Sequence, residues 1–180
     1  MLKQTILTHI HAYVSRYPGE APYVEPLLAM LVAGEDITSR QHFAGHVTAG
    51  TLLLDREQRY LAIHHKQLEK WLCPGGHLEP DETDPAQSAL RELIEETGIA
   101  PAGIGRDPRW SSMPVEIDHH PIPENSKKAE PAHSHWGFLY VFTLDRPAGE
   151  LTLDLTEVTA SCWRPVASLR PKVLERLSHP

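Results

Sequence analysis

Apolar residues recur every three to four positions at the start of the chain, which predicts helices. Residues 2–17 place leucine, isoleucine and tyrosine side chains on one helical face. A Pro18-Gly19 pair ends that helix, and a shorter helix fits residues 24–33, with Gly34 after its last turn. We therefore expect a helical extension over residues 1–40, ahead of a main domain over residues 41–180.

From His46 onward the pattern changes to that of strands. Residues 47–54 form a buried apolar run, and residues 60–64 fit its hairpin partner across a polar turn. The other predicted elements are strands over residues 115–122, 136–144, 151–155 and 158–163, and a closing helix over residues 166–177. Strands interleaved with helices predict a layered α/β domain.

A helix over residues 84–97 has clear end signals. Asp84 is a good N-cap, Pro85 suits the first helical position, and Gln87 stands where a capping box places its glutamine. Gly98 is a typical residue to end the helix. These signals fix which residues share each face of this helix.

One face of that helix is acidic. Glu92, Glu95 and Glu96 are spaced by three and four residues, so their carboxylates project from the same side. Clustered carboxylates are hard oxygen ligands for Mg²⁺ or Mn²⁺, and such ions activate water and stabilise the leaving oxygen in diphosphate cleavage. A solvated acidic face is the commoner explanation of such a triplet alone. The preceding Gly75-Gly76 pair favours the functional interpretation, because glycines allow backbone to approach a metal or phosphate closely.

The bulk composition excludes several classes of protein. A formal charge of −7 argues against a partner that is a nucleic acid polymer. No apolar run approaches the roughly 20 residues of a membrane span, so no membrane partner is expected. The N-terminus lacks the layout of a signal peptide, which predicts a cytoplasmic protein. A bridge between the two cysteines, Cys73 and Cys162, is not expected in that compartment.

Residues 75–99 resemble the Nudix box, in which a glycine is followed by a glutamate and then by Arg-Glu-apolar-x-Glu-Glu-x-Gly-apolar. The matching positions are Gly76, Glu82, Arg91, Glu92, Leu93, Glu95, Glu96, Gly98 and Ile99. The family's usual spacing puts seven residues between the glutamate and the arginine, whereas eight separate Glu82 from Arg91. The N-cap at Asp84 places the extra residue before the helix, so the register of the acidic residues is unchanged.

The resemblance implies an α/β/α sandwich with a mixed sheet. It also implies an Mg²⁺- or Mn²⁺-dependent hydrolase of a diphosphate linkage in a nucleoside diphosphate bonded to another group. Glu92, Glu95 and Glu96 would be metal ligands, with the Gly76 carbonyl a further one. Arg91 would orient a glutamate, and Glu95 is the preferred general base among several alternatives. The expected partners are a small nucleotide-type substrate and a second copy of the chain in a homodimer.

The resemblance extends to a bacterial branch of Nudix proteins that has an N-terminal helical extension. The matching segments are Gly45–Ala49, the Pro121-Ile122-Pro123 loop and the His133-Ser134-His135 strand. That branch carries an aspartate two residues after its second histidine, where this chain has Gly137. Any function of that acid is expected to be absent.

The count of twelve histidines is unusual for this length. His133 and His135 are two residues apart on a predicted strand and so point to one face, and His77 follows the glycine pair. We expect these three to line the substrate pocket, by hydrogen bonding to phosphate or by coordinating a transition metal. Half-buried polar residues that fix loops are the alternative. The expected substrate-binding set also includes the loop residues Glu79, Glu82 and Lys127.

Two other functions remain open. A catalytically weak Nudix domain would bind nucleotides as a sensor, although the intact Arg91-Glu92 and Glu95-Glu96 pairs argue against it. An isopentenyl-diphosphate isomerase on the same fold would need a cysteine and a glutamate for proton transfer. Cys73 is in a plausible region, but no matching motif surrounds it.

Overall fold

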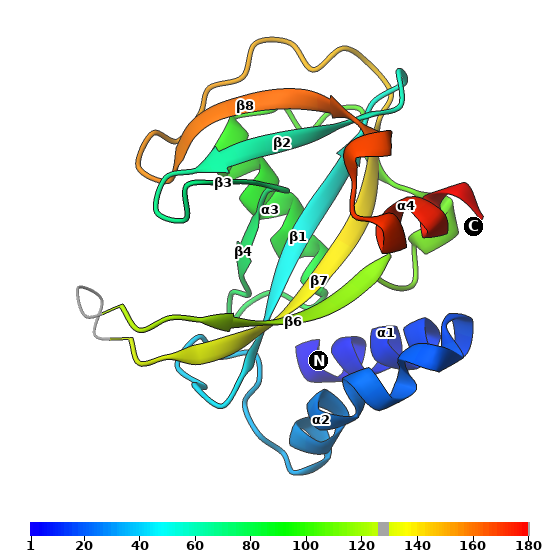
Figure 1. The fold of residues 1–180 in the computed structure, drawn as a ribbon, viewed down its shortest axis with the longest axis vertical. Helices are drawn as coiled ribbons and strands as arrows, with labels where there is room; N and C mark the ends of the chain where they lie inside the picture. Colours follow the sequence, from blue (N-terminus) through cyan, green and yellow to red (C-terminus); the bar gives the residue numbers. More distant parts are fainter. Residues whose placement is uncertain (126–129, 180) are drawn as a thin grey trace.

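The computed structural model describes residues 1–125 and 130–179, which fold around one mixed sheet (Figure 1). The strands are β1 (His46–Leu54), β2 (Arg59–His65), β3 (Lys70–Leu72), β4 (Gly75–His77), β5 (Ile104–Arg106), β6 (Glu116–Ile122), β7 (His133–Leu144) and β8 (Val158–Pro165). The main path runs β3-β2-β1-β7-β5, while β4 pairs with β1, β6 with β7 and β8 with β2. Only the β1–β7 pair is parallel among these strands. The sheet is therefore mixed, as predicted.

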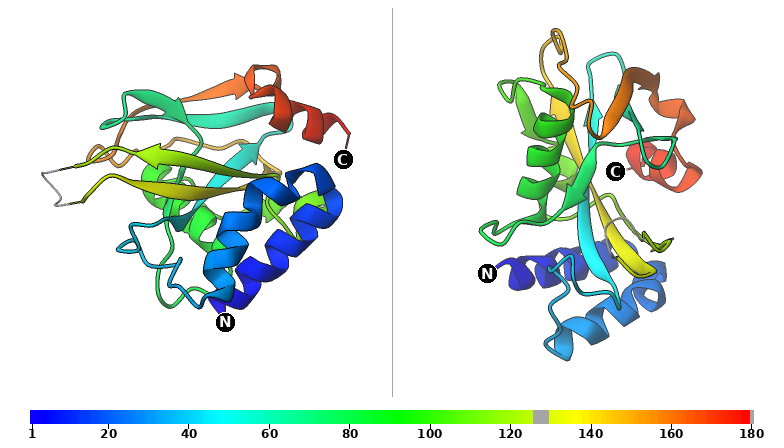
Figure 2. Two further views of the ribbon diagram at one scale, coloured as in Figure 1. Left: turned by 60° about the horizontal axis from the view of Figure 1, so that its bottom comes forward. Right: turned by 90° about the vertical axis from the view of Figure 1, so that its left-hand side faces the viewer.

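Helices cover both faces of the sheet. They are α1 (Leu2–Arg16), α2 (Ala21–Val32), α3 (Pro85–Thr97) and α4 (Pro171–Ser178). The right-hand view of Figure 2 shows α3 against one face and α4 on the other, with α1 and α2 at one end of the sheet. This arrangement confirms the predicted α/β sandwich with an N-terminal helical extension. Within the described part of the chain, each helix is too short or too polar to span a bilayer.

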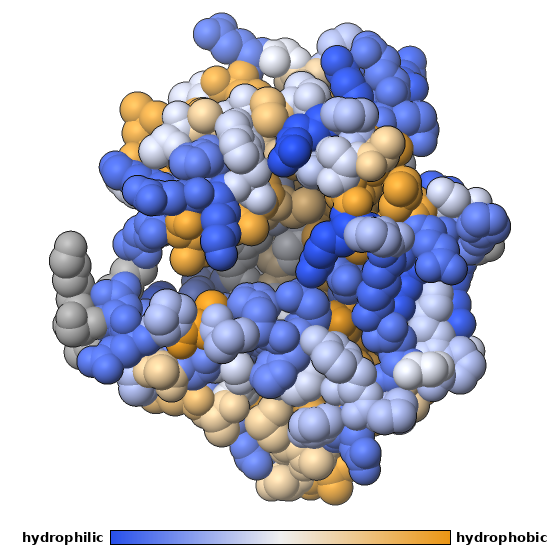
Figure 3. All heavy atoms as spheres, viewed as in Figure 1, coloured by the Kyte–Doolittle hydropathy of each residue, from blue (hydrophilic) through white to orange (hydrophobic). Residues whose placement is uncertain are grey.

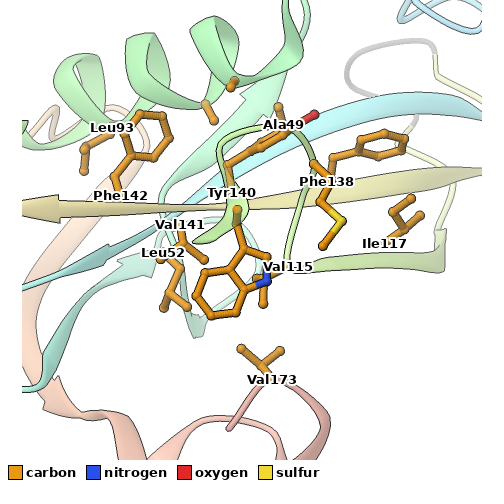
Figure 4. Close-up of a cluster of buried hydrophobic side chains, with 14 of the residues drawn as sticks. Ala49, Leu52, Leu93, Val115, Ile117, Phe138, Tyr140, Val141, Phe142 and Val173 are labelled. Carbon is orange, nitrogen blue, oxygen red and sulfur yellow. The ribbon is translucent and has the colours of Figure 1, made fainter. Parts of the chain in front are cut away.

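The core is built on both sides of β7, because neighbouring residues of a strand point to opposite faces. In Figure 4, Phe142 lies beside Leu93 of α3, whereas Val141 lies with Leu52 of β1 on the other side. All four side chains are buried. Burial of each such side chain contributes roughly 1.5–3 kcal/mol to stability. Packing of Leu93 thus presses α3 onto the sheet and fixes the direction of its acidic face.

The N-terminal helices are anchored to this core by buried polar contacts. His9 of α1 hydrogen-bonds through Nδ1 to the Tyr140 hydroxyl of β7 at 2.9 Å. Arg176 of α4 donates to the Tyr13 hydroxyl at 3.0 Å and to Glu20 at 3.0 Å. The extension therefore packs on the sheet and on α4.

The ends of α3 follow its sequence signals. The Asp84 side chain accepts a hydrogen bond from the Ala86 N–H at 2.8 Å, which confirms it as the N-cap. Gln87 accepts from the Thr83 N–H at 3.1 Å, one residue before the cap and not from the cap itself. Gly98 adopts a φ of 61°, a left-handed conformation that glycine accepts at little cost. The helix register is therefore the predicted one.

Two predicted elements are wrong. Residues 151–155 form no strand, because the N–H groups of Thr152 and Asp154 donate to the carbonyls of Thr97 and Glu96 at the end of α3. The closing helix does not start at Val166. A short 3₁₀ turn over Val166–Ser168 is followed by extended backbone, and α4 begins only at Pro171, since a residue before proline disfavours helical geometry.

Two short strands, β4 and β5, were not predicted, since each has only three residues, whereas β3 is the strand end expected before the glycine pair. A three-residue segment is too short to show an alternating pattern of apolar and polar positions. One of them, β4, contains the Gly75-Gly76 pair and His77, so an unpredicted element holds predicted site residues.

Candidate active site

The glycine pair of β4 is pressed between the sheet and α3. The Gly75 N–H donates to Glu96 Oε2 at 2.9 Å. A Cβ added at Gly75 would lie 2.6 Å from the Ala49 carbonyl oxygen of β1, and one at Gly76 would collide with the Glu92 carboxylate. Gly75 therefore requires glycine, because its Cβ would meet backbone, whereas at Gly76 the missing side chain leaves the space that the Glu92 carboxylate occupies. Two carboxylates of α3 thus lie directly against the β4 backbone.

The carboxylates at this contact carry poorly compensated negative charge. Burial, together with the neighbouring Glu92, Glu157 and Asp154, raises the pKa of Glu96 to about 8, although the hydrogen bond from the Gly75 N–H opposes this shift. Burial also raises the pKa of Glu92, although Arg91 opposes that shift. A raised pKa means that burial and nearby acids outweigh the cations around these carboxylates. A bound divalent cation would supply further positive charge.

Arg91 connects the loop and the helix. Its Nε donates to Glu82 at 3.0 Å, and its Nη2 donates to the His77 carbonyl at 2.8 Å. Nη1 donates to Glu92 at 2.9 Å and to Glu95 at 2.8 Å. Burial alone would lower the pKa of Arg91, but the Glu82 and Glu92 carboxylates raise it well above its ordinary value. The guanidinium is thus fully engaged with the protein and fixes the position of Glu92.

The remaining acids of the predicted site differ in their surroundings. The Glu95 side chain is 57% exposed, compared with 15% for Glu92, so Glu95 faces water. Glu82 accepts from the Glu79 N–H at 2.7 Å and from the Ser88 hydroxyl, so its carboxylate stabilises the loop before α3. Glu79 itself is exposed. The acids that lie against β4 are therefore Glu92, which is half-buried, and Glu96, which is buried.

A second group of titratable side chains lies at the beginning of β1 and β7 and the end of β4. We call His46, His77, His133 and His135 the histidine cluster. The rings of His46 and His135 are 4.5 Å apart, and those of His46 and His133 stack at 5.2 Å. The His77 ring lies 5.2 Å from His46. The three predicted histidines are therefore neighbours, and His46, which was not singled out from the sequence, lies at their centre.

Three rings of the cluster, those of His46, His77 and His135, have lowered pKa values and are neutral near physiological pH. Burial, together with neighbouring histidines, lowers the pKa of His135 to about 2 and that of His77 to about 4. Burial also lowers the pKa of His46. Each of these rings therefore presents one N–H and one nitrogen lone pair. This state suits metal coordination or a hydrogen bond to an anion.

An acid does lie where Gly137 lacks one. A Cβ at Gly137 would contact the carboxylate of Asp118, its partner across β6 and β7. Asp118 bonds to His120 Nδ1 at 2.9 Å, and the His120 ring lies 5.6 Å from that of His135. The structure thus places the Asp118 carboxylate of the neighbouring strand beside Gly137, while the expected loss of that acid's function stays a prediction.

The remaining predicted residues are Lys127 and the two cysteines. Lys127 lies outside the described residues. Cys73 and Cys162 are both free, as expected. Burial raises the pKa of the Cys73 thiol to about 12, so this side chain stays protonated and does not favour the isomerase alternative.

The sequence also missed two acids near Glu96. Asp154 and Glu157 lie in the segment between β7 and β8 and both raise the pKa of Glu96. Neither belongs to a motif, and backbone bonds from the N–H groups of Thr152 and Asp154 to the carbonyls of Thr97 and Glu96 bring this segment to α3. No local sequence pattern would have identified them.

A surface hollow gives access to this region. In Figure 3 the surface is hollowed between the part that contains β2 and β3 and the part that contains β6. In the same orientation in Figure 1, β4 and β1 cross this area. The strand that carries Gly76 and His77 therefore lies where a small molecule can approach.

Comparisons with known proteins point to one family. The NUDIX domain model matches residues 44–179 of this chain. The chain is 31% identical over 103 residues to "Probable DHNTP pyrophosphohydrolase" of Lactococcus lactis subsp. cremoris (strain MG1363), an alignment that covers 57% of each protein. It is 31% identical over 67 residues to "Putative 8-oxo-dGTP diphosphatase" of Bacillus subtilis (strain 168), covering 34% of this chain and 44% of that protein. The alignments thus span about half of each relative's length.

Solved structures share the fold. A C. elegans Ap4A hydrolase binary complex aligns with a TM-score of 0.55 and 17% identity, over 73% of this chain and 94% of that one. A NUDIX family hydrolase from Clostridium perfringens aligns with a TM-score of 0.53 and 19% identity, over 74% and 96%. Identities this low show the fold alone. Because the family model matches most of the chain, and the box residues converge on β4 and α3, the protein belongs to the Nudix family.

Proposed function

We propose that this protein is a divalent-metal-dependent pyrophosphohydrolase that cleaves a diphosphate linkage in a nucleoside diphosphate bonded to another group. The observation that carries the proposal is the contact between β4 and α3. There, the buried carboxylate of Glu96 and the half-buried carboxylate of Glu92 lie against the Gly75-Gly76 backbone. Buried acids of this kind are costly without a cation, so their retention favours a functional explanation.

The donor set fits Mg²⁺ or Mn²⁺. Glu92 and Glu96 would hold the ion, together with Glu95 and the Gly76 carbonyl, and all of these donors are the hard oxygen atoms that such ions prefer. The raised pKa of Glu96 and the space kept free at Gly76 are the features that a cation would use. When bound, the ion supplies positive charge to the phosphate oxygens and lowers the pKa of a water molecule.

The chain's own residues would prepare the site in three ways. Arg91 orients Glu92 through a charge-assisted hydrogen bond and ties α3 to the His77 carbonyl. The Gly75 N–H holds one oxygen of Glu96 and leaves the other free. Glu95 is the water-exposed carboxylate of the three and is our candidate for the general base.

The proposal covers a class of substrates and does not name a single compound. The names of the relatives refer to DHNTP, 8-oxo-dGTP and Ap4A, so they do not agree on a single substrate. We propose a small nucleotide-type diphosphate, with His77, Glu79 and Glu82 on the loop that would face it. Location in the cytoplasm and assembly as a homodimer stay predictions from the sequence.

A substrate panel tests this proposal. Nucleoside triphosphates, ADP-ribose, nucleotide sugars and dinucleoside polyphosphates would be incubated with Mg²⁺ or Mn²⁺, and released phosphates measured. We expect turnover of at least one class. In Glu96→Gln and in Glu92→Gln, kcat should be lower than in the wild type by about 100-fold or more. Glu25→Gln, at an exposed position of α2, is the control and should retain wild-type turnover.

Two results would overturn the proposal. The first is near wild-type turnover by Glu96→Gln, which would remove the carboxylate from the reaction. The second is tight nucleotide binding without turnover of any panel member, which would favour the sensor alternative.

A further inference from the structure

We propose that His46, His133 and His135 form a second metal site, separate from the carboxylates of α3, which binds a transition-metal ion of the Zn²⁺ class. Within the part of the chain that the structure describes, these three residues are the group whose ligand atoms converge for a metal ion. Each contributes one nitrogen, and the three nitrogens lie within 4.8 Å of one another. The inference does not depend on which diphosphate the protein cleaves.

The spacing of two of these nitrogens already suits a common ion. His133 Nε2 and His135 Nε2 are 3.1 Å apart. Two nitrogens at normal zinc distances and tetrahedral angles are about 3.3 Å apart. The third nitrogen, on His46, lies within 4.8 Å of both. The two histidines of β7 therefore already have nearly the nitrogen separation of two zinc ligands.

Backbone carbonyls set the tautomers of two of the three rings. His46 Nδ1 lies 3.3 Å from the His42 carbonyl oxygen, and His133 Nδ1 lies 2.8 Å from that of Pro131. A carbonyl only accepts hydrogen bonds, so Nδ1 carries the proton in each ring. In the neutral imidazole, Nε2 is then left with its lone pair. This is the usual arrangement of a metal-bound histidine, whose second nitrogen donates to a carbonyl.

His46 provides an independent indication of a ligand. The residue is only 1% exposed, and its Nε2 is a buried polar atom with no hydrogen-bond partner among the described residues. Buried polar atoms are normally paired, because an unpaired one loses its contact with water without compensation. The ring stands 4.5 Å from His135 and 5.2 Å from His133, between centroids. A metal ion among these rings would satisfy the unpaired nitrogen.

The chemistry of the donors selects the ion. Neutral imidazole suits Zn²⁺, Co²⁺ and Ni²⁺, whereas Mg²⁺ prefers hard oxygen ligands and keeps much of its water. The histidine site and the carboxylate site should therefore take different ions from the same solution. Three protein ligands leave at least one position for water or an anionic group.

Strand β4 lies between the two sites. Gly76 faces the Glu92 carboxylate, and the next residue, His77, extends toward His46, with 5.2 Å between the rings. Because neighbouring residues of a strand point in opposite directions, one strand borders both sites. The proposed ion would thus lie beside the same loop as the diphosphate-cleaving site without sharing its ligands.

Calorimetry on metal-stripped protein tests the proposal directly. Zn²⁺ would be titrated into the whole chain with Mg²⁺ in large excess, and Co²⁺ would be added separately to read its coordination from visible absorption. We expect one Zn²⁺ per chain and a Co²⁺ spectrum typical of nitrogen ligands. His133→Gln and His135→Gln should each weaken Zn²⁺ binding by about 100-fold or more. This is a larger loss than is typical when a residue that only hydrogen-bonds to a metal ligand is removed. His11→Gln, on the exposed side of α1, should bind as the wild type.

Two controls keep the result interpretable. The circular dichroism spectrum and the melting temperature of each metal-free variant must match those of the wild type. If the variant at the more buried ring, His135→Gln, does not fold, the result for His133→Gln decides. Glu92→Gln with Glu96→Gln should leave Zn²⁺ binding unchanged. Zn²⁺ binding that persists in both histidine variants, or that disappears in the glutamate variant alone, would overturn the proposal. Neither outcome requires activity, so failure here is distinct from failure of the proposed hydrolysis.

Discussion

The carboxylate site on α3 and the histidine cluster lie on either side of β4, but they are built in opposite ways. The carboxylates come from one short stretch of sequence, and a helix register brings them together. The histidines come from three segments that are joined only by strand pairing, in which His46 aligns with His135 and Thr48 with His77. A local site can be recognised as a motif, whereas a site made by the sheet becomes visible only in the fold.

The two sites also respond differently to burial. Burial raises the pKa of Glu92 and Glu96, so each acid resists ionisation until a cation is near. Burial lowers the pKa of His77 and His135, so each ring stays neutral. The first site thus favours hard cations with high charge density, and the second favours ions that accept nitrogen lone pairs. One loop can therefore serve two ions without competition.

The largest expected effect that separates the sites comes from Gly76→Ala. Its Cβ would collide with the Glu92 carboxylate and displace it. A displacement of about 1 Å at a reacting centre costs about 100-fold in rate, so we expect kcat to fall by that order. Steady-state kinetics with Mg²⁺ would measure the loss, and Zn²⁺ binding should be unchanged.

The matched control is Gly105→Ala on β5, where an added Cβ meets no atom within 4 Å. It should keep wild-type activity. Full activity in Gly76→Ala would show that the close contact between β4 and α3 is not part of catalysis. Loss of Zn²⁺ binding in the same variant would instead show that the two sites are coupled.

A smaller effect is expected from Arg91→Lys. Lysine keeps the charge but cannot hold Glu82, Glu92 and the His77 carbonyl at once, because it lacks the planar fork of arginine. We expect kcat to fall about 10-fold, equivalent to about 1.4 kcal/mol, with little change in KM, since Arg91 positions a ligand and does not touch substrate.

Arg56→Lys, at an exposed turn position, serves as the control for the same substitution. A large rise in KM with unchanged kcat in Arg91→Lys would contradict a positioning role. Reactivation of Arg91→Lys by higher Mg²⁺ concentrations would support it, because a poorly oriented Glu92 binds its cation more weakly.

The same contrast explains how much could be predicted from the sequence. The register of α3 followed from Asp84, Pro85 and Gly98, since caps and helical spacing are local properties. The mixed sheet and most of its strands followed from periodicity and from the resemblance to the Nudix family. The supposed strand over residues 151–155 failed because its N–H groups bond to the end of α3, a contact between segments that are about 55 residues apart.

The site shows the same division. Glu92 and Glu96 were identified from spacing, and the structure places both against the glycine pair. His46 and Glu157 were missed because their roles depend on which strand or loop lies next to them. The position of Asp118 beside Gly137 could not be foreseen either, because it depends on the pairing of β6 with β7. Single-sequence reasoning therefore located residues joined by a helix and missed those joined by the sheet.

The smallest expected effect concerns His9, a buried histidine outside both sites. It tests how burial changes the pKa of an imidazole in this fold. Burial lowers its pKa from 6.5, while Asp84 opposes this shift and Arg106 adds to it. Below about pH 6.5 the unfolded chain binds a proton at His9 that the folded protein does not. Stability therefore rises with pH through this window and is lost as pH falls, by at most about 1.4 kcal/mol per pH unit for this proton.

Urea denaturation between pH 7 and pH 5 would measure this slope. His9→Gln should flatten it, since glutamine can still bond to the Tyr140 hydroxyl but has no proton to gain. His11→Gln, two residues away on the exposed side of α1, should leave the slope unchanged. Equal slopes in the two variants would mean that burial does not hold His9 neutral. A flatter slope in His9→Gln alone would show that burial keeps an imidazole neutral in this fold without any metal ion, which is the state that the histidine cluster needs before an ion arrives.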